Sequence, residues 1–215
     1  MKLEDLKLEY DQLQKKYGAK DLDSIYYGGE KNNPEICFVF MNPTKKNPAS
    51  KKEWQGLKAP WIGTKNIWDL FYQVNLLKEE VYWQIKSKKG SEWDYQFAEL
   101  VYEEVKKHHY YITNLGKCTQ VDARPLPDST FKEYLNLFLK EIEIVNPKKI
   151  ILFGNQVSSL VLNEKITVST CRRKKFIKEI GSKKYPLYAV FYPVGNGRFN
   201  LDKAIDDIKW IIENE

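Results

Sequence analysis

Four short runs of the chain are almost continuously hydrophobic and are rich in β-branched or aromatic residues. Polar residues would alternate with apolar ones if one face of a strand met water, so these runs predict strands of a parallel sheet that is covered on both faces. The predicted strands cover residues 35–41, 110–115, 149–153 and 187–192.

Segments with apolar residues at helical spacing lie between these runs and at both ends of the chain. They predict helices over residues 3–17, 65–77, 93–108, 129–145, 155–162 and 201–213. Ser129 is expected to be the N-cap of its helix, because Lys132 and Glu133 follow it in a capping-box pattern.

The alternation of strands and helices is typical of an α/β fold with right-handed crossovers. We therefore expect a three-layer α/β/α sandwich around a central four-stranded parallel sheet. A chain of 215 residues is long enough for one well-buried domain. We expect a single domain over residues 1–215, in which residues 1–32 form an N-terminal helical extension.

Composition excludes several classes of protein. No run approaches the roughly 20 apolar residues that cross a bilayer, and residues 1–20 are charged and amphipathic rather than a signal peptide. We therefore expect a cytoplasmic protein that does not bind membranes and needs no second subunit. The three cysteines, Cys37, Cys118 and Cys171, include no CxxC pair, which argues against a disulfide framework and against a zinc site.

The net charge is +6, which is compatible with a polyanionic partner, although many basic proteins bind no nucleic acid. The basic stretch over residues 172–175 is interpreted as a solvated loop in preference to a phosphate contact. His108 and His109 precede the second strand, at the end of the sheet away from a ligand site, and are expected to be surface residues.

Polar residues follow each predicted strand. Asn42 and Pro43 follow the first strand, and Asn114 ends the second. A turn with Gly154 and Asn155 follows the third strand, and a glycine-rich loop with one arginine, residues 193–198, follows the fourth. Asparagine is common in turns for purely local reasons. Ligands of open α/β sheets bind beyond the carboxyl ends of the strands, however, so we expect these residues to share one polar pocket.

Several motifs, in this order along the chain, resemble those of the uracil-DNA glycosylase superfamily, over roughly residues 33–212. The similar segments are Phe38-Val39-Phe40-Met41-Asn42-Pro43-Thr44, Ala59-Pro60-Trp61-Ile62-Gly63-Thr64, Ile112-Thr113-Asn114-Leu115-Gly116-Lys117-Cys118, Arg124-Pro125-Leu126-Pro127, residues 146–154, and Tyr192-Pro193. The first is similar to the Asn-Pro motif of the mismatch-specific and single-strand-selective branches, and the third to the Thr-Asn-x-x-Lys-Cys stretch of the thermostable branch.

The resemblance implies a DNA glycosylase that extrudes uracil or another deaminated base from DNA and hydrolyses its bond to deoxyribose. By the same resemblance, Asn42 positions the attacking water, Trp61 stacks on the flipped base, and Asn114 reads the edge of that base. Met41 contributes backbone to the wall of the pocket.

The resemblance also implies a set of DNA contacts. Arg198, in a loop to which Gly195 and Gly197 give freedom, is expected to enter or flank the minor groove. Thr44, Lys45 and Lys117 are expected contacts to DNA. Lys46 is a further candidate, although these lysines are equally well explained as solvated surface residues.

The chain departs from the family pattern at two places. Tyr192 stands where the family usually has a histidine, and Asn196 is the residue that can compensate for it. The thermostable branch holds an iron–sulfur cluster with four cysteines, whose early pair is absent here, so the chain is predicted to need no cluster and no other cofactor.

Two alternatives stay open beside a glycosylase that acts on uracil or a related base. Tyr192 favours a weak or inactive relative that binds DNA without cleaving it. An α/β enzyme acting on a free nucleoside or nucleotide is the third hypothesis, although the chain has no phosphate-binding glycine motif of the GxxxxGK[ST] type.

Overall fold

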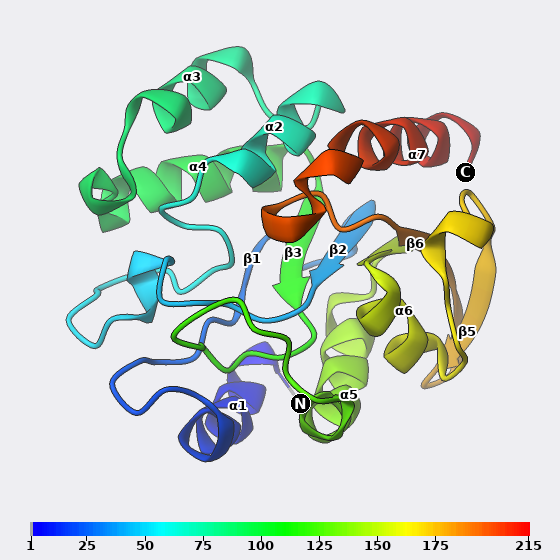
Figure 1. The fold of residues 1–215 in the computed structure, drawn as a ribbon, viewed down its shortest axis with the longest axis horizontal. Helices are drawn as coiled ribbons and strands as arrows, with labels where there is room; N and C mark the ends of the chain where they lie inside the picture. The colour runs from blue at the N-terminus through cyan, green and yellow to red at the C-terminus, as the bar shows by residue number, and fades with distance from the viewer. Residues whose placement is uncertain (1) are drawn as a thin grey trace.

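The computed structural model describes residues 2–215, and its centre is a six-stranded mixed sheet (Figure 1). The strand order is β1-β3-β2-β4-β6-β5. The strands are β1 (Tyr27–Gly29), β2 (Ile36–Phe40), β3 (Tyr110–Asn114), β4 (Lys149–Phe153), β5 (Phe176–Ile180) and β6 (Lys183–Val190).

The four predicted strands correspond to β2, β3, β4 and β6, and they pair in parallel at the centre of the sheet. The expected sheet of four strands is nevertheless too small, because β1 and β5 add an antiparallel strand at each edge. β1 is only three residues long, and β5 has exposed positions, so neither carries the continuous apolar pattern of a central strand.

Helices cover both faces of the sheet and complete the three layers (Figure 1). One apolar core contains residues of α2 (Asn66–Gln73), α3 (Glu79–Ser87), α4 (Tyr95–Lys107) and α7 (Leu201–Asn214). The other contains residues of α1 (Leu3–Tyr17), α5 (Asp128–Val145) and α6 (Asn155–Leu162). Four short 3-10 turns also occur: η1 (Pro48–Ser50), η2 (Gly90–Glu92), η3 (Val168–Thr170) and η4 (Gly195–Asn200).

Two expectations about helices are wrong in detail. The helix predicted over residues 65–77 ends at Gln73, and α3 follows as a separate helix that the prediction lacked. Ser129 is not an N-cap, because α5 begins at Asp128 and Pro127 precedes it. Pro127 has an extended ψ of 152°, and a proline disfavours helical geometry in the residue before it, so the helix starts directly after Pro127 in spite of the local capping pattern.

The pairing of β2 with β3 brings two asparagines to the same edge of the sheet. Phe40 lies opposite Asn114 in the parallel register. The ladder continues past the strand ends, since Leu115 N donates to Phe40 O and Gly116 N donates to Met41 O, both at 2.8 Å. The chain after β2 and the chain after β3 therefore leave the sheet side by side.

The N-terminal helix α1 packs beside α5 on one face of the sheet (Figure 1). Leu3, Leu6 and Tyr10 bury their side chains in the core on that side. Over residues 2–215, no helix is both long and apolar enough to span a bilayer.

Candidate active site

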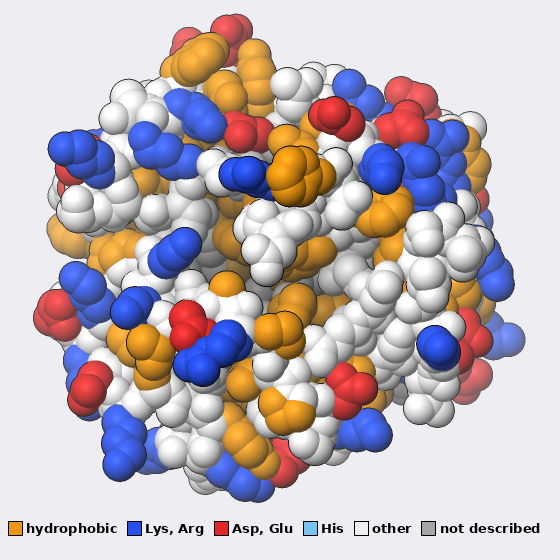
Figure 2. Space-filling model, viewed as in Figure 1, with side chains coloured by type: hydrophobic (Ala, Val, Ile, Leu, Met, Phe, Trp, Pro, Cys, Tyr) orange, Lys and Arg blue, Asp and Glu red, His pale blue; other side chains and the backbone are white. Residues whose placement is uncertain are grey.

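A cavity of about 860 Å³ opens at the edge of the sheet where the parallel strands end. Residues 41–48 after β2, residues 60–67 leading into α2, and residues 195–197 of η4 form most of its wall. Figure 2 shows the hollow near the middle of this face, with lysine and arginine side chains around it. The chain segments after β2, β3 and β6 therefore meet at one cavity, as expected. The turn after β4 does not join them, because Gly154 and Asn155 are outside the lining and Asn155 Oδ1 accepts a hydrogen bond from Val168 N at 2.9 Å.

The wall of this cavity carries positive charge and no acid. Among the described residues that line it, none is Asp, Glu or His, and four are lysines: Lys45, Lys46, Lys51 and Lys65. Such a wall favours an anionic ligand, and it offers no carboxylate or imidazole to take a proton from a water.

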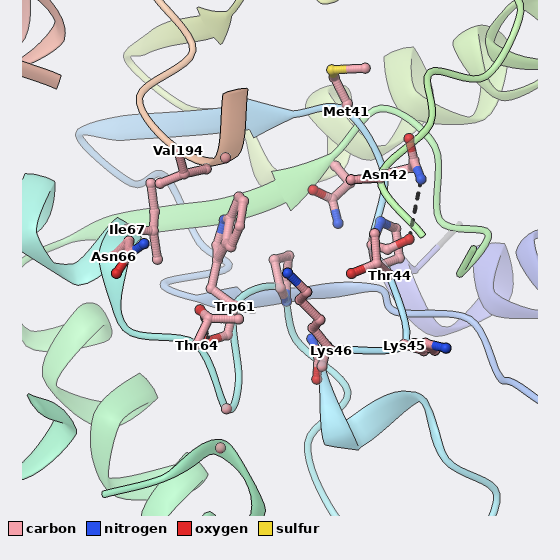
Figure 3. Close-up of a pocket in the computed structure, with 18 of the residues that line it drawn as sticks. Met41, Asn42, Thr44, Lys45, Lys46, Trp61, Thr64, Asn66, Ile67 and Val194 are labelled. Atoms are coloured by element: carbon pink, nitrogen blue, oxygen red, sulfur yellow. Dashed lines mark hydrogen bonds between the residues drawn. The ribbon is translucent and has the colours of Figure 1, made fainter. Parts of the chain in front are cut away.

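Asn42 lies two residues beyond the end of β2 and lines the cavity. Its side-chain Nδ2 donates a hydrogen bond to the carbonyl oxygen of Pro43 at 3.2 Å (Figure 3). This bond fixes the orientation of the Asn42 amide plane and uses one of the two N–H donors of Nδ2. The Oδ1 atom accepts no hydrogen bond within residues 2–215 and remains available to accept one from a water.

Asn114 is the last residue of β3 and lies at the base of the same cavity, with 2% of its surface exposed. Its backbone carbonyl accepts a hydrogen bond from the ammonium of Lys117 at 2.7 Å. A side-chain amide can donate to one carbonyl of a bound base and accept from its ring N–H. Asn114 is therefore well placed to read a polar ring edge inside the cavity.

Trp61 projects into the cavity from a strained turn (Figure 3). Its φ of +69° is rare for a bulky residue and indicates a conformation held by its surroundings. Thr64 holds the turn, donating from N and from Oγ1 to the Trp61 carbonyl. The ring meets Phe40 edge-on at 4.9 Å, and its buried Nε1 has no hydrogen-bond partner within residues 2–215.

Tyr192 follows β6, lines the cavity, and approaches Phe40 edge-on, with ring centroids 6.3 Å apart. Burial raises the pKa of its hydroxyl from 10.0 to about 12. The phenol is therefore neutral at physiological pH and can offer a single hydrogen bond to a ligand.

The glycine-rich segment after Tyr192 forms the 3-10 turn η4 instead of a free loop. Gly195 has φ +60°, which favours glycine, and a Cβ on Gly197 would lie 2.1 Å from the Tyr192 carbonyl oxygen. Gly195, Asn196 and Gly197 line the cavity. Arg198 is outside the lining, and its guanidinium lies 4.9 Å from the ring of Phe199, which is 80% exposed.

Thr44, Lys45 and Lys46 continue the wall after Asn42. Figure 3 shows that the side chain of Lys46 points into the cavity between Trp61 and Thr44, whereas that of Lys45 points away from it. Both lysines are exposed. An isolated parallel β-bridge joins Thr44 to Gln120, which lies in the segment that follows β3.

Lys117 does not reach this surface, so its expected contact with DNA is wrong. The side chain is fully buried and forms an ion pair with Glu141 of α5, with Nζ 2.9 Å from the carboxylate. Desolvation lowers the pKa of this lysine, and the neighbouring Glu141 opposes that effect.

A family model described as the uracil DNA glycosylase superfamily matches residues 27–209 of the chain. The chain belongs to this superfamily. The match covers the helices on both faces of the sheet apart from α1 and the end of α7 after residue 209, together with every segment that lines the cavity. The resemblance predicted from the motifs is therefore confirmed, and membership in a superfamily that generally hydrolyses N-glycosidic bonds indicates DNA glycosylase chemistry.

Two residues of this glycosylase-family site were not singled out from the sequence. Asn47 is buried, and its Nδ2 donates to Ala59 O at 2.8 Å. This hydrogen bond links the segment that carries Asn42 to the segment that carries Trp61. Phe199 is the large exposed aromatic residue beside Arg198. An aromatic residue directly after a glycine-rich turn was a usable signal for Phe199, but no local pattern pointed to Asn47.

The remaining candidates lie away from the cavity. Arg172 and Arg173 form ion pairs with Asp206 and Asp207 of α7, so these two arginines are not free for phosphate. Lys174 and Lys175 of the same stretch are exposed in a loop, as expected. Cys37 and Cys118 are buried and Cys171 is half-buried. Within residues 2–215, no three His, Cys, Asp or Glu residues gather as metal ligands do.

Proposed function

We propose that the chain is a monofunctional DNA glycosylase that hydrolyses the N-glycosidic bond of uracil or another deaminated base in DNA. One observation carries the proposal. Asn42, two residues beyond β2, and Asn114, the last residue of the neighbouring parallel strand β3, line a cavity together with Trp61, and the described wall of this cavity holds lysines but no carboxylate or histidine. In this proposal the enzyme acts alone, as a monomer inside the cell, and needs no cofactor.

The water is oriented rather than deprotonated. Asn42 is a very weak base, but its Oδ1 can accept a hydrogen bond from a water placed below C1′ of the sugar. Departure of the base then precedes attack: the C1′–N bond breaks, the sugar becomes an oxocarbenium-like cation, and the water oxygen bonds to C1′. The proton released from the water passes to solvent, and the base leaves as an anion.

The departing anion is stabilised by donors and by nearby positive charge. Tyr192 supplies a neutral hydroxyl, and Asn196 on η4 is a further amide donor. Lys46, whose ammonium points into the cavity, adds a positive charge (Figure 3). These groups take the place of the histidine that the family usually has at the position of Tyr192.

Base recognition is assigned to Trp61 and Asn114, with Met41 forming part of the wall. The indole stacks on the extruded base, and the Asn114 amide pairs with a carbonyl and an adjacent ring N–H. Uracil, hypoxanthine and xanthine all present that pair of groups, whereas cytosine does not. Thymine and guanine present the same pair of groups, so this contact rejects cytosine and adenine but does not by itself separate deaminated bases from thymine or guanine.

The mouth of the cavity faces the DNA. Thr44 and Lys45 contact the phosphate backbone on the side of β2. On the opposite side, Arg198 and Phe199 of η4 enter the duplex, where an exposed aromatic residue can fill the gap left by the extruded nucleotide.

The test uses oligonucleotides that carry one uracil, hypoxanthine or xanthine, in single-stranded and duplex form. After incubation, alkali cleaves any abasic site, and the products are separated on a denaturing gel. Strand cleavage at the modified position, absent with unmodified oligonucleotides, is the expected result. No cleavage of any substrate, at protein concentrations that saturate binding, would contradict the proposal.

The second candidate is a relative that binds DNA without cleaving it, and Tyr192 in place of the histidine is the observation that favours it. A phenol donates one neutral hydrogen bond, which is a smaller stabilisation of an anion than a charged donor provides. Saturable DNA binding with no cleavage in the same assay is the result that this candidate predicts. Failure to bind DNA at low salt would instead favour an enzyme of free nucleosides.

A further inference from the structure

The side of the sheet opposite Trp61 contains a buried ion pair that the proposed chemistry does not use. Lys117 and Glu141 are both fully buried, and they lie in an otherwise apolar core. Lys117 Nζ is 2.9 Å from the Glu141 carboxylate and donates at 2.7 Å to the backbone carbonyl of Asn114. The ion pair is therefore joined directly to the residue assigned to base recognition.

A buried ion pair is stable only where further hydrogen bonds satisfy its remaining lone pairs. Glu141 accepts three, from the hydroxyls of Tyr10 at 2.7 Å, Tyr111 at 3.1 Å and Thr113 at 2.5 Å. Tyr111 and Thr113 belong to β3, the strand that ends at Asn114. Tyr10 comes from α1 and is therefore the N-terminal helix's contribution to this network.

The helix α1 also forms hydrogen bonds to the segment that follows Asn114. Gln14 Oε1 accepts a hydrogen bond from the backbone N–H of Thr119 at 2.7 Å. Gln120 Nε2 donates to the carbonyl of Tyr17 at 2.8 Å. These two bonds attach α1 to the segment after the strand, and the bond of Tyr10 attaches it to Glu141 of α5.

The segment that matches the superfamily begins at residue 27, after α1 ends at Tyr17. The attachment is thus made by a part of the chain that lies outside the matched segment. Asn114 is held on one side by the ladder to β2, through Leu115 N and Phe40 O, and on the other by Lys117. Removing either support leaves its backbone free to shift by a fraction of an ångström.

We infer that Tyr10 is a positioning residue: through Glu141 and Lys117 it holds Asn114 in register for reading the base. The inference rests on the proposed function, since it assigns Asn114 its role in the same cavity. It makes the N-terminal helix a structural part of the active site, although no residue of α1 lines the cavity.

The variant Tyr10→Phe tests this, because it removes one hydroxyl and leaves the ring in place. Tyr27→Phe is the matched control, since Tyr27 is buried in the same core and its hydroxyl has no partner within residues 2–215. We expect Tyr10→Phe to lower kcat about tenfold with KM unchanged, given that a misplacement of 1 Å costs on the order of a hundredfold. Tyr27→Phe should match the wild type.

A double-mutant cycle separates positioning from general loosening of the fold. In the background of Asn114→Ala, Tyr10→Phe should have no further effect, because the residue it acts through is gone. The inference is wrong if Tyr10→Phe lowers kcat by the same factor in the Asn114→Ala background as in the wild type. It is also wrong if Tyr10→Phe alone leaves kcat unchanged. Gln14→Met, which breaks the bond to Thr119, serves as a second variant and should lower kcat in the same direction.

A measurement that does not depend on enzymatic activity tests this inference separately from the proposed function. The side-chain amide resonances of Asn114, assigned by NMR in the free full-length protein, should shift or broaden in Tyr10→Phe and stay in place in Tyr27→Phe. Unchanged resonances in Tyr10→Phe would overturn the inference. If the wild-type protein excises no base from any substrate, the proposed function is wrong, but the NMR comparison still tests whether Tyr10 positions Asn114.

Discussion

In the proposed mechanism, Asn42 and Tyr192 set the chemistry at the scale of single residues, because neither exchanges a proton near neutral pH. The proposal has the Asn42 amide orient a water, and burial raises the pKa of Tyr192 to about 12, so its hydroxyl keeps its proton. No carboxylate or histidine lies among the described residues of the wall. The catalytic groups of the cavity therefore hold one protonation state over the physiological range.

A pH profile tests this directly. The single-turnover rate of excision should be flat from about pH 6 to about pH 8.5, since a raised phenol pKa keeps the neutral donor at every pH below it. Tyr192→His should add a titration near the ordinary histidine range of about 6.5. A step or a bell shape in the wild-type profile would show that an unassigned acid or base takes part.

The sequence was enough to predict lining residues after β2, β3 and β6, but not after β4, where Gly154 and Asn155 lie outside the lining. Met41, Asn42, Asn114 and Tyr192 are such residues, and strand ends of a parallel sheet share one edge by geometry. Lys117 was misplaced because the direction of a side chain three residues past a strand depends on what packs there. Its partner Glu141 lies on a different helix, which no local pattern connects to it.

At the scale of elements, η4 differs most from its prediction. Its glycines suggested a free loop, yet Gly197 has no room for a Cβ beside the Tyr192 carbonyl, and the segment forms a 3-10 turn. A fixed turn presents Arg198 and Phe199 in a defined direction. In the proposed complex, the fixed backbone reduces the conformational entropy that is lost when the ring enters DNA.

Phe199→Ala tests the role of this turn. If the ring fills the gap left by an extruded nucleotide, its loss should slow excision from duplex DNA by about tenfold and leave excision from single-stranded DNA nearly unchanged. The two substrates are compared at saturating enzyme under single-turnover conditions. An equal loss on both substrates would assign Phe199 to the structure of the cavity and not to the duplex.

The central strands were predicted well and the edges were not, for a physical reason. A central parallel strand is buried on both faces and so is apolar at every position, as in Ile36–Phe40. The edge strand β5 meets solvent, with Ile177 57% exposed, and its pattern is no stronger than that of a loop. The helix α3 was missed because it buries only Val81 and Ile85, which is too short an apolar pattern to predict a helix.

At the scale of the whole molecule, the net charge of +6 matters through its distribution. Four lysines surround the cavity with no described acid in its wall, whereas the arginines of residues 172–173 are neutralised by α7. The molecule therefore has an excess of positive charge near the proposed chemistry, although Lys51 lies 4.0 Å from the carboxylate of Glu53. Association with DNA at that face should release counterions and weaken as salt rises.

The salt dependence of binding tests this distribution. Lys46→Ala should reduce the slope of log K against log salt concentration by about one unit, as expected for one lost phosphate or anion contact. Lys209→Ala, an exposed lysine of α7 away from the cavity, is the matched control and should keep the wild-type slope. Equal slopes for all three proteins, measured by fluorescence anisotropy, would place the DNA elsewhere.

The most direct test of the account compares Asn42→Ala with Asn66→Ala, both asparagines of the same cavity that lie on opposite sides of Trp61 (Figure 3). Single-turnover excision of the preferred base is measured alongside DNA affinity. The account predicts that Asn42→Ala lowers the rate roughly hundredfold or more with affinity unchanged, and that Asn66→Ala keeps the wild-type rate. Excision by Asn42→Ala at the wild-type rate would contradict it.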